Sequence, residues 1–465
     1  MMKTNGGMKM KEKRDYSQIT PEIKKLSDLC IKDGIIDKDL YLKYKVNRGL
    51  RDLNGNGILT GLTEISEITA KKIVNGEELP CDGSLYYRGY NIKDLVKGTL
   101  ANGHFGFEEI TYLLIFGELP RKDELETFER VLADYRSLPN SFVRDIIMKA
   151  PSSDIMNSLS RSVLTLYSYD NNANDLSIEN VLRQCLQLTA LFPQLAIYGY
   201  QAYDYYIKDS NSFFFHNPDP GLSTAENILH MLRPDMKFSP LEAKLLDLAL
   251  IIHAEHGGGN NSTFTTHVVT SSGTDTYSAV SAALGSLKGP KHGGANIKVC
   301  DMFRDIKAHV FDWNDDEEIE NYVKKLVNKE AYDKTGLVYG IGHAVYSKSD
   351  PRAEIFRAFV EMLAKEKGMQ NEYHLYSAVE KIAPKIISDS RKMYKGVSAN
   401  VDFYSGFVYQ MLGIPEELFT PLFAVARISG WSAHRLEELI NGGKIIRPAY
   451  KAVAQHRDFV SMENR

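Results

Sequence analysis

Hydrophobic residues recur at helical spacing along most of the chain. Residues 107–118 repeat apolar side chains every three or four positions, and Leu119-Pro120 predicts the end of that helix. Residues 241–256 are apolar nearly all round, which is typical of a helix buried in a large protein, and Gly257 to Gly259 predict its end. The pattern predicts further helices at residues 18–45, 121–136, 140–150, 177–208 (with Pro193 as a kink or break), 315–329, 353–367 and 375–389.

One region near the N-terminus has the character of strands. Asn54-Gly55 and Asn56-Gly57 are dipeptides that favour hairpin turns. We expect short strands around Ile58-Leu59 and from Leu85 to Tyr90. The chain is therefore predicted to be all-α with minor β hairpins near the N-terminus, and residues 1–15 are predicted to be a flexible tail.

Composition narrows the class of protein. The 465 residues are enough for two or three domains, and 43% hydrophobic with 25% charged residues is ordinary for a soluble globular protein. A net charge of -4 without a basic run argues against a nucleic-acid partner, and no run of about 18 apolar residues predicts a membrane helix. Four scattered cysteines without a C-x-x-C pair argue against disulfides and a zinc site, so we expect a cytoplasmic protein.

The stretch from Leu337 to Arg352 (LVYGIGHAVYSKSDPR) combines a glycine-rich loop with a histidine and an arginine. The glycines let a ligand approach the backbone around His343. Asp350-Pro351 predicts a helix start, which places Arg352 at an electropositive helix end where an anion can be held. The alternative is a glycine-rich turn with a structural histidine.

Two further histidines are candidates for chemistry. His256 lies near the end of the buried helix, where a protonated ring is favoured and could contact a carboxylate. His253, three residues earlier, is expected to be structural, and the pair lacks the spacing and the third ligand of a zinc site, so no metal is expected. His292 lies in the glycine-rich stretch GPKHGGAN, which could also be a simple turn.

A carboxylate and two arginines lie in apolar surroundings. Asp402 is the acid in NVDFYSGF, and burial there would raise its pKa and make it a stronger base. The alternative for Asp402 is the N-cap of the following helix. Arg427 lies in an apolar helix and Arg447 follows two isoleucines, so each is expected to have a carboxylate partner, either in the protein or in a ligand.

The motifs HAEHGGGNNST, GPKHGGAN, YGIGHAVYSKSDPR and NVDFYSGF, followed by the two arginines, occur in this order. Together they resemble the citrate synthase family over residues 50–448. The resemblance implies a homodimer with a large helical domain (residues 16–296 and 415–465) and a smaller inserted helical domain on the coenzyme A side (residues 297–414). It implies an active site in the cleft between these domains, with a contribution from the partner subunit.

The resemblance also implies roles for individual residues. The catalytic positions are taken by His292, His343 and Asp402. The oxaloacetate-binding positions are taken by His256, Arg352, Arg427 and Arg447, of which Arg447 would reach across the dimer. The coenzyme A-binding positions are taken by Leu337, Val338, Tyr339, Gly340, Ile341, Gly342, Lys348 and Asn400. No cofactor is implied, because acetyl-CoA is a substrate.

The expected reaction joins the methyl carbon of acetyl-CoA to the ketone carbon of oxaloacetate, and water then releases citrate and coenzyme A. Asp402 would take the methyl proton, His292 would hold the thioester oxygen and His343 would protonate the ketone oxygen. The alternative is a 2-methylcitrate synthase that uses propionyl-CoA, since only a pocket for one methyl group differs. A remote alternative is a non-catalytic ligand-binding paralogue.

Overall fold

The computed structural model describes residue 17 and residues 19–52, 55–210, 212–342, 345–391 and 396–464. The chain divides into two compact units, residues 1–62 and 63–465.

The first unit confirms the helices predicted for residues 18–45. It contains α1 (Pro21–Gly34), α2 (Lys38–Lys43) and the 3-10 turn η1 (Arg48–Leu50). The strand predicted around Ile58-Leu59 is wrong, because the only strand-like pairing among the described residues of this unit is an isolated bridge between Arg51 and Gly57. Two apolar residues without further alternation do not supply the buried face that a strand needs. Asn54 lies outside the described residues.

The second unit begins with a three-stranded antiparallel sheet of order β1-β2-β3. Strands β1 (Ser66–Val74) and β2 (Glu77–Tyr87) are joined by Asn75-Gly76, whose φ angles of 53° and 84° suit a two-residue hairpin turn. Strand β3 (Tyr90–Asn91) follows a tight turn. The strand predicted from Leu85 to Tyr90 is therefore the end of β2, a turn and the start of β3. The sequence analysis did not predict β1, although Asn75-Gly76 after it is a dipeptide that favours hairpin turns.

Helices form the rest of the second unit. They are α3 (Ile92–Asn102), α4 (Phe107–Phe116), α5 (Lys122–Asp134), α6 (Ile155–Leu166), α7 (Ile178–Tyr206), α8 (Thr224–Leu232), α9 (Pro240–His253), α10 (Asn261–Thr270), α11 (Thr276–Leu287), α12 (Ala295–His309), α13 (Asp316–Val327), α14 (Pro351–Glu366), α15 (Gln370–Arg391), α16 (Val401–Met411) and α17 (Phe419–Ile440). Shorter turns are η2 (Val143–Ile147), η3 (Tyr167–Tyr169), η4 (Glu416–Leu418) and η5 (Met462–Asn464).

Three of the helix predictions need correction. Residues 140–150 contain only the π-type turn η2, since Ser141 has a left-handed φ of 62° just before it. Helix α7 continues through Pro193, so of the predicted kink or break the break is wrong. Helix α9 ends at His253 instead of at Gly257, which leaves His256 in the turn beyond the helix.

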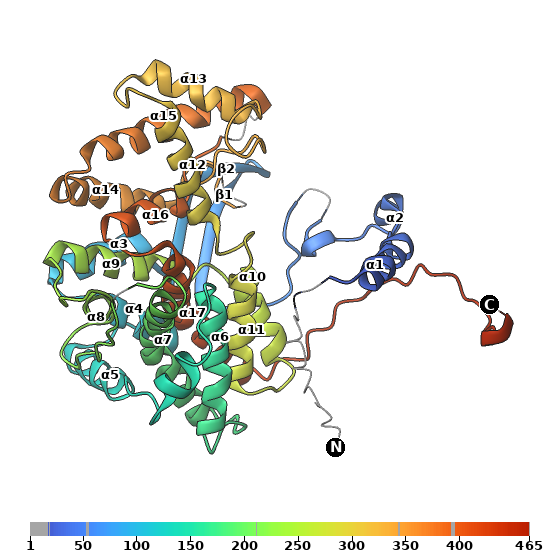
Figure 1. The fold of residues 1–465 in the computed structure, drawn as a ribbon, viewed down its shortest axis with the longest axis horizontal. Helices are drawn as coiled ribbons and strands as arrows, with labels where there is room; N and C mark the ends of the chain where they lie inside the picture. Colours follow the sequence, from blue (N-terminus) through green and yellow to red (C-terminus); the bar gives the residue numbers. More distant parts are fainter. Residues whose placement is uncertain are drawn as a thin grey trace, which may run out of the picture. The chain divides into compact units, whose positions relative to one another are not determined.

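Helix α17 lies at the centre of the larger helical body. It packs against α4, α7, α9 and α10, and every residue from Phe419 to Leu436 is buried (Figure 1). Helices α12 to α16 gather at one end of the unit (Figure 1), and all but the first two residues of α12 lie in the predicted small domain of residues 297–414. The predicted domain boundaries stay a prediction. Within the described ranges, no helix has both the length and the apolar character that a membrane span requires.

Candidate active site

Arg427 is a fully buried arginine at the centre of α17. Its Nε donates a hydrogen bond of 2.8 Å to the carbonyl oxygen of His253, and its guanidinium lies 4.8 Å from the ring centroid of Phe423. Among the described residues, neither Nη1 nor Nη2 has a hydrogen-bond partner. Buried donors without acceptors are costly, and a guanidinium fork fits a carboxylate. Arg427 is therefore suited to hold an anionic ligand.

Arg352 is buried in the first turn of α14, where the sequence pattern predicts it. Asp350 caps this helix and pairs with the guanidinium through contacts of 3.1 Å to Nε and 2.8 Å to Nη2. Burial opposes the charge of Arg352, but the neighbouring Asp350 outweighs it and raises the pKa. Asp350 also accepts a hydrogen bond of 3.3 Å from the backbone N–H of Val401, which links α14 to the start of α16.

Asp402 lies in the first turn of α16. The N-cap of that helix is Asn400, whose side chain accepts the N–H of Asp402 at 2.9 Å, so the alternative that Asp402 is the cap is wrong. Burial raises the pKa of Asp402 to about 6, against the opposing charges of Arg352 and Arg427. Groups from α14, α16 and α17 therefore act on one carboxylate, which becomes a stronger base than an exposed aspartate.

His292 lies in the turn before α12, and its Nε2 is 3.1 Å from the hydroxyl of Ser262. The same hydroxyl oxygen accepts a hydrogen bond of 3.1 Å from Trp431 on α17. Burial, helped by the charge of Arg427, lowers the pKa of His292 to about 4. The ring is therefore neutral at pH 7. Ser262 belongs to the GGGNNST motif, so the structure brings this motif into contact with GPKHGGAN.

His256 is buried, and its ring centroid lies 5.7 Å from that of Tyr346. The guanidinium of Arg352 lies 5.9 Å from the same tyrosine ring. Tyr346 therefore brings together two residues predicted to bind oxaloacetate. His253 is structural as expected: its Nδ1 is 2.8 Å from the carbonyl oxygen of Ala249, and burial lowers its pKa to about 3.

The segment predicted to hold coenzyme A pairs with the residues that precede α16. The N–H of Gly342 donates to Ser398 at 2.7 Å, and the backbone and side chain of Asn400 donate to Gly340 and Gly342 at 2.9 and 2.7 Å. Gly340 has a φ of 80°, and a Cβ there would lie 2.9 Å from the Cα of Phe403. Glycine therefore allows this backbone to lie against the helix that carries Asp402.

The other predicted coenzyme A residues have mixed environments. Val338 is buried, whereas Leu337 and Lys348 are exposed. Tyr339 donates to Asp333 at 2.6 Å, and Ile341 forms a bridge with Ala399.

Two predicted site residues are not placed with the others. His343 lies outside the described residues. Arg447 is exposed and makes no hydrogen bond or ion pair to a described residue, so its role across a dimer stays a prediction. In the part of the chain that the structure describes, no group of three or more His, Cys, Asp or Glu side chains could hold a metal ion.

The model of the family "Citrate synthase, C-terminal domain" matches residues 53–449. A citrate synthase from Synechocystis sp. is 36% identical over 83% of this chain and 89% of its own length. The 2-methylcitrate synthase 1 of Corynebacterium glutamicum is 31% identical over 90% of this chain and 99% of its own length.

Solved structures agree with these sequence matches. Citrate synthase from Pyrobaculum aerophilum has a TM-score of 0.72 at 30% identity, covering 90% of this chain and 94% of that one. The ternary complex of citrate synthase from Thermoplasma acidophilum with carboxymethyl coenzyme A and oxaloacetate has a TM-score of 0.73 at 27% identity, covering 90% and 99%.

Proposed function

This chain belongs to the citrate synthase family, and from that premise we propose that it condenses acetyl-CoA with oxaloacetate and water to give citrate and coenzyme A. The observation that carries the proposal is the unfilled fork of Arg427 together with the partly buried carboxylate of Asp402, on which the charge of Arg427 acts. The first group is suited to a ligand carboxylate and the second to removing a proton from carbon. This reaction would bring carbon into the tricarboxylic acid cycle.

Oxaloacetate would bind through its two carboxylates. Arg427 offers two buried NH2 groups that have no acceptor among the described residues. Asp350 pairs with Arg352 and holds its guanidinium in place. Arg352 and His256 both lie against the ring of Tyr346. We propose that these three residues orient the keto acid, and that Arg447 of the partner subunit completes the set.

Asp402 would take a proton from the methyl group of acetyl-CoA. A thioester methyl is a weak acid, so the developing enolate oxygen needs a hydrogen-bond donor. A neutral His292 can donate an N–H hydrogen bond to this oxygen while it keeps its proton. The lowered pKa of His292 supports that role. We propose that His343 protonates the ketone oxygen of oxaloacetate, and that water then hydrolyses the citryl thioester.

Acetyl-CoA would lie along residues 337–342, where backbone pairing with residues 398–400 holds the loop beside Asp402. Lys348 and Asn400 would contribute polar contacts from either side. We propose that the enzyme acts without a resident cofactor or metal, because both substrates supply the reacting groups.

We propose that the protein works as a cytoplasmic homodimer. The four cysteines are free in the structure, which supports a reducing compartment. The exposed position of Arg447 supports a role in a neighbouring subunit. Light scattering coupled to size-exclusion chromatography measures the subunit number, and a monomer with full activity would contradict the dimer.

A second candidate function is 2-methylcitrate synthase. The 31% identity to the Corynebacterium glutamicum enzyme over 90% of this chain favours it specifically. The same catalytic residues would serve, and one extra methyl group in an apolar pocket changes specificity by only about 1–3 kcal/mol. Activity with both thioesters is therefore expected.

The proposal is tested by measuring free thiol release from acetyl-CoA and from propionyl-CoA, each with and without oxaloacetate. We expect release to require oxaloacetate, with a higher kcat/KM for acetyl-CoA. A higher kcat/KM for propionyl-CoA would select the second candidate. Oxaloacetate binding without thiol release from either substrate would refute both.

A further inference from the structure

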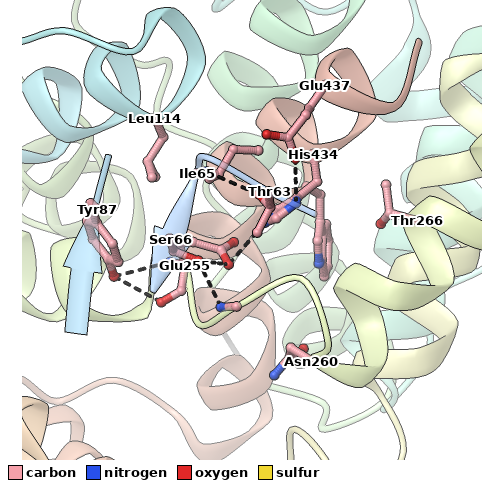
Figure 2. A network of polar contacts seen from close by, with 12 residues as sticks. Thr63, Ile65, Ser66, Tyr87, Leu114, Glu255, Asn260, Thr266, His434 and Glu437 are labelled. Atoms are coloured by element: carbon pink, nitrogen blue, oxygen red, sulfur yellow. Dashed lines mark hydrogen bonds and ion pairs between the residues drawn. The ribbon is translucent and has the colours of Figure 1, made fainter. Parts of the chain in front are cut away.

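The residues on either side of His256 are held by the sheet. Ser66, at the start of β1, donates its hydroxyl to Glu255 Oε1 at 3.0 Å and accepts the N–H of Gly257 at 3.1 Å. The hydroxyl of Tyr87, on β2, accepts the N–H of Glu255 at 3.2 Å and lies 3.0 Å from the carbonyl oxygen of the same residue. Figure 2 shows Ser66 and Tyr87 converging on Glu255. His256 therefore sits between two anchored neighbours.

Glu255 is a fully buried carboxylate with a positive partner on α17. The ring of His434 is also fully buried, and its Nε2 lies 3.2 Å from Glu255 Oε1 (Figure 2). On its other side, His434 Nδ1 lies 3.1 Å from His267 Nε2, and His267 Nδ1 lies 2.8 Å from Glu438 Oε2.

The protons of this histidine pair can be counted. A ring nitrogen that faces a carboxylate, or the other ring, needs a proton in the gap, because two lone pairs repel each other. The three contacts are Glu255–His434, His434–His267 and His267–Glu438, and each needs one proton. Two neutral imidazole rings carry only two protons on their nitrogens, so the third proton gives the histidine pair one positive charge. Burial and the charge of His434 lower the pKa of His267.

Glu255 carries the matching negative charge. Burial alone would raise the pKa of Glu255, but the charges of His434 and Arg427 and the hydroxyl of Ser66 outweigh burial and bring it to about 2. A buried ion that leaves its counter-ion is strongly destabilised. The Glu255 side chain is therefore held where His434 and Ser66 meet it.

Helix α17 meets the turn before His256 at three successive points on one face. Arg427 donates to the carbonyl oxygen of His253, and His434 pairs with Glu255. Between them lies Gly430, where a Cβ would be 2.6 Å from the carbonyl oxygen of Ala254. Positions three and seven residues apart share a helix face. The helix that presents Arg427 thus also sets the position of the turn that presents His256.

We propose that Ser66, Glu255 and His434 are positioning residues that hold His256 in register with Arg427 to receive the two carboxylates of oxaloacetate. The proposal rests on the function proposed above. None of the three residues needs to touch the substrate. Their contribution is to keep two binding groups, one on a turn and one on a helix, at a constant separation.

The test compares Ser66→Ala with Ser66→Thr, which keeps the hydroxyl. Oxaloacetate affinity is measured directly by isothermal titration calorimetry, and KM is measured for each substrate with the other saturating. Losing the bridge between Glu255 and Gly257 should weaken oxaloacetate binding about five- to ten-fold, which corresponds to one or two hydrogen bonds. The KM of Ser66→Ala for acetyl-CoA should stay within about two-fold of the wild-type value. Ser66→Thr should recover most of the affinity for oxaloacetate.

Thr69→Ala is the matched control. Thr69 lies on the same strand, and its hydroxyl donates to Glu67 in an exposed contact. This variant should bind oxaloacetate as the wild type does. His434→Gln, which removes the charge opposite Glu255, should weaken oxaloacetate binding more than Ser66→Ala; if it does not fold, the two Ser66 variants still decide the matter.

The outcomes separate this proposal from the proposed function. Unchanged oxaloacetate affinity in Ser66→Ala would overturn the positioning role even if the wild type is fully active. An equal rise in the KM of both substrates would also overturn it, because that result indicates a general loss of structure. Wild-type protein that binds oxaloacetate but releases no thiol would refute the proposed reaction, while the affinities of the variants would still test the positioning. A wild type that does not bind oxaloacetate would overturn both.

Discussion

Replacing Arg427 with methionine should make the ligand-free protein more stable and remove oxaloacetate binding. The two buried NH2 groups of Arg427 have no acceptor among the described residues, and each such group costs about 1–3 kcal/mol. The substitution also removes the bond to His253, a loss of about 1.5–3 kcal/mol for a charged donor. At the midpoints of these ranges, the net gain in the free energy of unfolding is about 2 kcal/mol.

Ligand binding should change in the opposite direction. A fork that holds a carboxylate through two charged hydrogen bonds contributes enough that its loss weakens oxaloacetate binding by about 100-fold or more. Wild-type protein at a ligand concentration of about 100 times Kd should gain about 2.7 kcal/mol from oxaloacetate. Differential scanning calorimetry should therefore show a raised midpoint for free Arg427→Met and no further rise when oxaloacetate is added.

Arg435→Met is the matched control on the same helix. Arg435 is equally buried, but its three nitrogens donate to Thr276, Thr270 and Thr274 at 3.2, 3.1 and 2.8 Å. Removing Arg435 leaves the oxygens of these three threonines without their donor. The free energy of unfolding should therefore fall by about 3–5 kcal/mol, while the folded fraction still binds oxaloacetate. If Arg427→Met lowers the unfolding midpoint as much as Arg435→Met does, the proposal that the Arg427 guanidinium is a binding group for a ligand carboxylate is wrong.

Four further predictions concern the proposed base and the coenzyme A segment. Asp402→Asn should keep oxaloacetate affinity but reduce thiol release by about 10²–10⁴-fold, and more than a tenth of wild-type turnover would contradict its role as base. Because burial raises the pKa of Asp402 to about 6, kcat/KM for acetyl-CoA should fall about ten-fold per pH unit below pH 6; a flat profile between pH 5 and 7 would refute this. The same shift means that the folded protein binds more protons than the unfolded chain, so the contribution of Asp402 to stability should decrease as the pH rises from about 4 to 6. Gly340→Ala should raise the KM for acetyl-CoA and lower the unfolding midpoint, since its Cβ would meet Phe403 at a φ of 80°, whereas Gly98→Ala in open space on α3 should be neutral or stabilising.

Hydrophobic periodicity was sufficient to predict many of the helices. It located α4, α9, α13 and α14 within a few residues, because the apolar face of a helix depends on residues only three or four positions apart in the sequence. It was less successful at element ends, as the early end of α9 shows, and it missed β1, whose pairing with β2 joins segments that each look ambiguous alone. The ordered motifs identified the family without any structure.

What the sequence by itself determined is the set of candidate side chains; what they meet was decided by packing. Arg427 and Arg435 lie eight residues apart in one apolar helix and look alike in sequence. Among the described residues, two nitrogens of Arg427 have no acceptor, whereas every side-chain nitrogen of Arg435 donates to a threonine residue. The partner of Arg427 is 174 residues away in the chain, and those of Glu255 are 189 and 179 residues away. Burial raises the pKa of Asp402, whereas His434, Arg427 and Ser66 outweigh burial and keep Glu255 charged. Both effects come from the folded surroundings, which no local pattern contains.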